Sequence, residues 1–99
     1  MKNKDELLKI LREIEKNPNI SQRELAANVN FSLGKLNYCL KALKNKGLIK
    51  IENFKKNPNK IYYIYVLTPK GIAAKTKLTV NFMKLKMKEY DELRKEVGK

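Results

Sequence analysis

The segment from residue 32 to residue 41 combines hydrogen-bonding, glycine and aromatic residues with the spacing of an amphipathic helix. Leu36, Leu40 and Leu43 recur at intervals of four and three, which predicts one buried face and leaves the residues between them facing outward. On such a face asparagine can pair with the edge of adenine and lysine with that of guanine, while glycine allows close approach. The sequence therefore predicts a face that reads base edges in a major groove, through Ser32, Gly34, Lys35, Asn37, Tyr38 and Lys41. An ordinary solvated face is the alternative interpretation.

Two further segments carry groups suited to binding phosphate. Ser21 and Gln22 open a short predicted helix, where backbone N–H groups have no partner within the helix and attract anions. Lysines gather in the polar, turn-forming segment from residue 55 to residue 60. We expect both segments to contact a phosphate backbone, through Ser21, Gln22, Lys55, Lys56 and Lys60. For the lysines, a solvated loop tip is the alternative.

The composition excludes most enzyme classes. The chain has no histidine and one cysteine, Cys39, so His-based acid/base chemistry, Cys/His zinc sites and an intrachain disulfide are all ruled out. The ten acidic residues lie mostly in lysine-interleaved stretches near the two ends, where solvated ion pairs along a helix explain them. We expect no catalytic residues, no metal and no cofactor. Cys39 is predicted to be a small buried residue, with a redox sensor as the alternative.

The charge of the chain points to a polyanionic partner. Lysine and arginine number 23 against 10 acids, which gives a formal net charge of +13, and between residues 25 and 88 Glu52 is the single acid against fourteen lysines. The longest uncharged hydrophobic run, from Ile61 to Leu67, is too short for a membrane span of about 20 residues. The start of the sequence also lacks the apolar region of a signal peptide. We expect a cytoplasmic protein without a membrane partner.

Periodicity and capping residues predict the elements that position these groups. Ser21 to Glu24 forms a capping box, Ser32 is a second N-cap, and Thr68-Pro69 is an N-cap followed by proline. After Gly47 the apolar period changes from helical spacing to two. The predicted elements are a helix from 5 to 16, a short helix after Ser21, a helix from 33 to 46, two strands within 48–53 and 61–67, and a helix from 69 to 97.

This order predicts a mainly α fold with a small β-hairpin, a winged helix-turn-helix with a long C-terminal helix. Residues 1–68 would form the DNA-binding domain, and residues 69–99 would add a dimerisation helix to the same structural unit.

The last predicted helix carries two apolar stripes. Leu78, Phe82 and Leu85 form one, which we expect to pack on the parent domain. The other is predicted to make a dimer contact, through Met83, Tyr90, Leu93 and Val97. A homodimer would place two recognition helices about one DNA turn apart, roughly 34 Å, and predicts an inverted-repeat site. A helix folded back entirely on its own domain is the alternative.

Four segments together resemble the MarR family of bacterial winged-helix regulators, and more narrowly its short subgroup associated with exopolysaccharide gene clusters. They are Ile20 to Ala26, Ser32 to Leu43, Lys46 to Phe54 and Leu67 to Ile72. The run from Ser32 to Leu40 is the most specific, since Gly-Leu and Leu-Thr-Pro-Lys-Gly occur in many winged helices. The resemblance implies transcriptional control through DNA binding, with the third helix as reader and the hairpin as wing. Full-length relatives have extra helices at both ends that build the dimer and a ligand pocket, whereas one long helix stands here. The resemblance therefore does not predict a small-molecule effector pocket of the usual kind.

Together these features predict a sequence-specific regulator that binds double-stranded DNA as a dimer. The alternative is a winged-helix interaction module that binds RNA or an acidic protein, because one fold can serve several functions.

Overall fold

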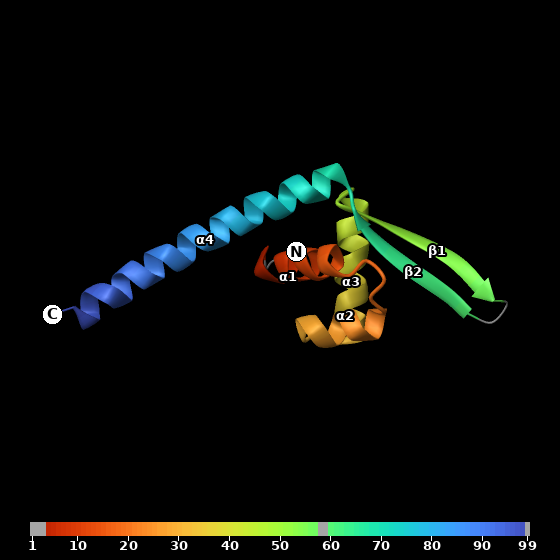
Figure 1. The fold of residues 1–99 in the computed structure, drawn as a ribbon, viewed down its shortest axis with the longest axis horizontal. Helices are drawn as coiled ribbons and strands as arrows, with labels where there is room; N and C mark the ends of the chain where they lie inside the picture. The colour runs from red at the N-terminus through yellow and green to blue at the C-terminus, as the bar shows by residue number, and fades with distance from the viewer. Residues whose placement is uncertain (1–3, 58–59, 99) are drawn as a thin grey trace.

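The computed structural model describes residues 4–57 and 60–98, and within these it describes the side chains of residues 4–52 and 63–98. It confirms the predicted fold class, a helical domain with one antiparallel hairpin and a long C-terminal helix (Figure 1). The elements are α1 (Lys4–Lys16), α2 (Gln22–Val29), α3 (Leu33–Asn45), β1 (Ile49–Asn57), β2 (Lys60–Leu67) and α4 (Pro69–Val97).

Side-chain caps fix where the helices begin. The Ser21 hydroxyl accepts a hydrogen bond from the backbone N–H of Glu24 at 3.1 Å, and the Ser32 hydroxyl accepts one from that of Lys35 at 3.1 Å. The helix α2 ends at Asn30, whose φ of 60° is left-handed. These caps set the lengths of α2 and α3 and the turn between them.

The core forms where α1, α2 and α3 meet. Leu11, Leu25, Leu36 and Leu43 have no exposed surface, and Ile49 from β1 is 2% exposed in the same cluster. The apolar positions of α1 all lie on one side, so that helix packs on α2, on α4 and on the base of the hairpin.

The hairpin is anchored at its base and extends away from the helices (Figure 1). Its register pairs Ile49 with Leu67 and Ile51 with Tyr65. Tyr65 is 1% exposed, and its backbone N–H donates to the carbonyl oxygen of Pro18 at 3.2 Å. The sheet therefore shares the helical core at one end, and its far end carries the residues of the predicted basic tip.

A tight junction holds the start of α4 against the end of α3. Gly47, at φ 74°, is the left-handed residue after α3, and the Thr68 hydroxyl donates to its carbonyl oxygen at 2.6 Å. The same hydroxyl accepts from the backbone N–H of Gly71 at 3.0 Å. A Cβ atom at Gly71 would overlap the backbone carbonyl of Leu48. Residue 71 must therefore be glycine for α4 to begin this close to β1.

The helix α4 packs on the domain with its first half only. Ala74 and Leu78 are partly buried against the core, and the Lys75 Nζ atom lies 2.7 Å from the Glu15 Oε1 atom on α1. Every residue from 83 to 98 is exposed, and α4 extends beyond the rest of the molecule (Figure 1). The fold-back alternative is therefore wrong. Leu85, expected on the domain-facing stripe, is 60% exposed because the straight helix has left α1 by that point. Within the described residues, none of the helices combines the length and the hydrophobicity that a membrane-spanning helix requires.

Gly71→Ala should lower the free energy of unfolding by about 1–3 kcal/mol, because the added methyl group meets backbone rather than a movable side chain. Urea titration measures this. The control is Gly34→Ala, where a Cβ atom meets nothing within 4 Å, so stability should hold or rise. Equal stability of Gly71→Ala and the original chain would contradict the close contact.

Candidate nucleic-acid interface

The turn between α2 and α3 presents one face of α3 to solvent. The backbone N–H of Phe31 donates to the Ala26 carbonyl oxygen at 2.8 Å, which closes the turn. Leu36, Cys39 and Leu40 on the inner side of α3 are at most 2% exposed. The opposite side of α3 is exposed, and no other described residue covers it. Contact with base edges, as predicted, requires such an accessible face.

The centre of this outward face is formed by Gly34, Tyr38 and Lys41. All three are exposed, and Tyr38 keeps 67% of its surface in solvent. Asn45, one further helical turn along, is exposed on the same side, and sequence reasoning missed it although it continues the spacing of four and three. We call Gly34, Tyr38, Lys41 and Asn45 the outward face of α3.

Asn37 lies at the edge of this face and joins it to α2. The Gln22 Nε2 atom donates to the Asn37 Oδ1 atom at 2.9 Å. The structure thus brings together a predicted phosphate contact and a predicted base contact. Asn37 keeps its amide N–H donors, and its oxygen can accept a second hydrogen bond. Its approach angle to a ligand is therefore set by the start of α2.

Lys35 lies on the other flank of α3, toward α1. Its Nζ atom is 2.8 Å from the Glu6 Oε1 atom and 4.4 Å from the centroid of the Phe31 ring. The ammonium group is thus paired and stacked within the monomer, unlike Lys41, which makes no ion pair with any described residue. Because of these contacts, we expect Lys35 to orient α3 against α1 more than it reads bases.

The start of α2 is the described part of the predicted phosphate site. The Ser21 hydroxyl is engaged as the cap and also donates to the Glu24 Oε1 atom at 3.1 Å, so its main role here is structural. Gln22 is half-buried, and Arg23 beside it is exposed. Arg23 was not among the predicted contacts, although a cation in the first exposed turn of this helix suits a phosphate.

The three predicted lysines of the hairpin lie near its far end. Lys55 and Lys56 belong to β1 and Lys60 opens β2, with Lys60 opposite Asn57 in the register. Their side chains lie outside the described residues.

Two titratable groups lie behind the outward face. Burial raises the pKa of the Cys39 thiol, Glu6 raises it further, and Lys35 lowers it in part. Burial likewise raises the pKa of the Tyr65 hydroxyl, which the neighbouring Gln22 side chain lowers in part. Both groups are therefore neutral near pH 7, and the surface potential of this side comes from the lysines and Arg23.

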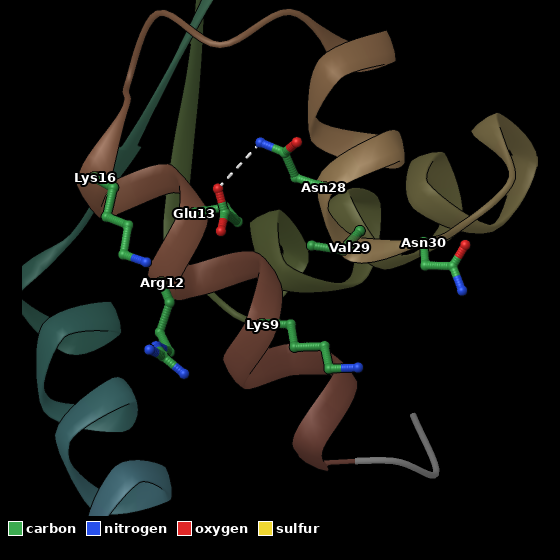
Figure 2. Close-up of a pocket in the computed structure, with 7 residues that line it drawn as sticks. All are labelled: Lys9, Arg12, Glu13, Lys16, Asn28, Val29 and Asn30. Carbon is green, nitrogen blue, oxygen red and sulfur yellow. Dashed lines mark hydrogen bonds between the residues drawn. The ribbon is translucent and has the colours of Figure 1, made fainter.

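A shallow hollow of about 220 Å³ lies between α1 and the end of α2 (Figure 2). The Asn28 Nδ2 atom donates to the Glu13 Oε2 atom across it at 3.3 Å (Figure 2). None of the predicted contact residues lines it. The lining residues are Lys9, Arg12, Glu13, Lys16, Asn28, Val29 and Asn30. The described residues also contain no group of three His, Cys, Asp or Glu side chains that could hold a metal ion.

Comparison with known proteins supports the fold. A family model described as winged helix-turn-helix DNA-binding matches residues 7–50, which include α1, α2, α3 and the start of β1. No curated protein sequence matches the chain. The winged helix-turn-helix predicted from the order of the elements is thereby confirmed.

Solved structures of MarR-type proteins share this fold. Staphylococcus aureus MarR in complex with salicylate and kanamycin has a TM-score of 0.67 at 24% identity, over 87% of this chain and 56% of its own. Lactococcus lactis ZitR, a zinc-responsive MarR family member, has a TM-score of 0.69 at 21% identity, and the match covers 97% of this chain and 64% of ZitR. MepR, a transcription regulator of the S. aureus multidrug efflux pump MepA, has a TM-score of 0.69 at 18% identity. The match covers 95% of this chain and 68% of MepR. The chain thus spans less than two thirds of MarR and of ZitR.

The native chain should resist thiol reagents. Cys39 is 1% exposed and its thiol pKa is raised. It should therefore react at least about tenfold more slowly in the native protein than in the urea-unfolded protein. A chromogenic disulfide at pH 8 measures the two rates. The raised pKa means that the folded state favours the protonated thiol. The stabilisation from this group is therefore complete below the ordinary thiol pKa of about 8.5, and it is lost as the pH rises through the pKa of the thiol in the folded protein. Rapid, complete labelling of native protein would instead favour the redox-sensor alternative.

Proposed function

We propose that this protein is a sequence-specific, double-stranded DNA-binding transcriptional regulator that acts as a homodimer in the cytoplasm. The main support for this proposal is the outward face of α3, which is exposed and lies next to the start of α2. A major groove of about 12 Å admits a helix presented in this way. The match to a DNA-binding winged-helix family supports it.

Affinity and specificity come from different parts of this surface. The net charge of +13, together with exposed Arg23 and the lysines of the hairpin, would neutralise phosphates and release counterions, so binding should weaken steeply with salt. Asn37, Tyr38 and Lys41 would contact base edges and supply sequence preference. In this proposal residues 1–68 bind DNA and residues 69–99 pair the subunits.

The controlled genes are the most specific part of the proposal. MepR is a transcription regulator, which supports a regulatory function for a chain of the same fold. The resemblance of the segment from Ser32 to Leu40 to the short MarR subgroup leads us to propose genes of an exopolysaccharide cluster as targets. Neither enzymatic activity nor a cofactor or small effector is needed for this mechanism.

Asn37→Ala and Lys41→Ala should reduce discrimination between the selected site and a scrambled duplex by about 1–3 kcal/mol each, because each removes a base contact. Selection from random duplexes, followed by fluorescence anisotropy at fixed salt, gives the two affinities. Lys9→Ala is the matched control, since this exposed lysine lies at the hollow of α1 and should leave discrimination unchanged.

A uniform loss of affinity for all duplexes in the Asn37 and Lys41 variants would show that these residues do not read bases.

A competition experiment tests whether duplex DNA is the partner. Duplex DNA should displace RNA and polyglutamate at moderate salt, whereas preference for RNA or for the acidic polypeptide would establish the interaction module instead.

A further inference from the structure

The exposed half of α4 carries a continuous apolar seam. Val80, Met83, Met87, Tyr90 and Val97 recur at intervals of three, four, three and seven, with Arg94 in the remaining position, as in the a and d positions of a coiled coil. Met83, Met87 and Tyr90 are 56%, 63% and 64% exposed. The seam lies roughly 140° around the helix from the stripe that packs on α1, so the same domain cannot cover it. Exposed apolar residues in a row mark a contact surface.

The charges of α4 are separated along its length. From residue 69 to residue 88 it has six lysines and no acid, whereas from residue 89 to residue 97 it has four acids and two bases. Two such helices side by side in parallel would place lysines next to lysines and acids next to acids, and would bring the two Arg94 side chains together in the seam. Antiparallel helices place the basic stretch of each beside the acidic stretch of the other and also align their dipoles favourably.

We propose that a second copy of this chain covers the seam, and that the two α4 helices pair antiparallel with Met87 opposite the partner's Tyr90. This inference deepens the proposed function and rests on its homodimer. In this register Val80 lies opposite the partner's Val97, and Met83 opposite the partner's Arg94. Leu93 flanks the seam and adds apolar contact at its edge.

The register also assigns one pair of charges on each side of the seam. Lys84 follows Met83 and lies beside the partner's Asp91, and by symmetry Asp91 lies beside the partner's Lys84. Neither residue makes an ion pair within the described monomer, whereas Lys86 already lies 3.4 Å from the Glu89 Oε2 atom and near the Phe82 ring. In a parallel pair Asp91 would instead lie beside the partner's Lys86.

The same register gives a domain spacing that suits DNA. At 1.5 Å per residue, Ala74 and Leu78, which pack on the domain core, lie about 44 Å and 32 Å along the helix pair from their counterparts. One DNA turn of roughly 34 Å falls between these values. The antiparallel pair therefore holds the two domains at a distance compatible with adjacent major grooves on one side of a duplex.

Disulfide trapping tests the orientation. In a Cys39→Ala background, a mixture of Met83→Cys and Arg94→Cys subunits should form the mixed disulfide on oxidation, detected by mass spectrometry. Each variant alone should not crosslink, because its two cysteines would lie about 16 Å apart along the axis, beyond the 7 Å limit for a disulfide. Efficient crosslinking of Met83→Cys with itself would indicate a parallel pair and overturn the inference.

Charge exchange tests the register in the full chain. Lys84→Glu and Asp91→Lys should each weaken the dimer by roughly tenfold in Kd, and the double variant should restore it, as measured by analytical ultracentrifugation. The matched control is Lys86→Glu with Asp91→Lys, which should show no such restoration. Restoration in the control and none in the Lys84 pair would contradict the antiparallel register.

Different results would contradict the antiparallel register and the homodimer itself. A dimer that binds its duplex but crosslinks in the parallel pattern removes the antiparallel register and leaves the proposed function standing. A chain that stays monomeric at high concentration and on DNA removes the homodimer itself and this inference with it.

Discussion

Burial of the aliphatic side of α3 determines how the surrounding elements are arranged. Leu36, Leu40 and Leu43 are fully or almost fully buried against α1 and α2. A truncation to alanine at such a site typically costs about 2–5 kcal/mol, a large part of the stability of a small domain. This packing fixes the rotation of α3 about its own axis. It therefore decides which residues face outward and can meet a nucleic acid.

Local chemistry explains why most of the fold could be predicted from the sequence. Ser21, Ser32 and Thr68 each begin a helix with a side-chain cap, and the structure shows all three hydrogen bonds. Gly47 has the left-handed backbone expected after α3. These signals act over three or four residues, so they are readable without knowledge of how the elements pack.

Contacts between distant segments were the part that could not be predicted. The pairing of Lys35 with Glu6 depends on the angle between α3 and α1, which no local pattern encodes. The same holds for the approach of Gly71 to Leu48 and for the exposure of Leu85 beyond the end of the α1 contact. The outward face of α3 was predictable because helical spacing alone defines it, although the division between its centre and its flanks was not.

The single helix α4 connects the end of the molecule proposed to bind DNA to the end proposed to pair with a second subunit. Thr68 and Gly71 hold the start of α4 against the end of α3 and the base of the hairpin, so α4 and the outward face of α3 are oriented by the same junction. Pairing at the far end of α4 would therefore set the positions of both reading surfaces at once. The lysine-rich first half of α4 adds positive charge to the same particle, which favours approach to DNA.

In the proposed mechanism the outward face of α3 contacts the DNA. Titration of isotope-labelled protein with the selected duplex, monitored through the amide chemical shifts, would locate this contact. The largest shift changes are expected at Gly34, Tyr38 and Lys41, with further changes at Gln22 and Arg23. Changes confined to the hollow of α1 or to the end of α4, with α3 unaffected at saturation, would contradict it.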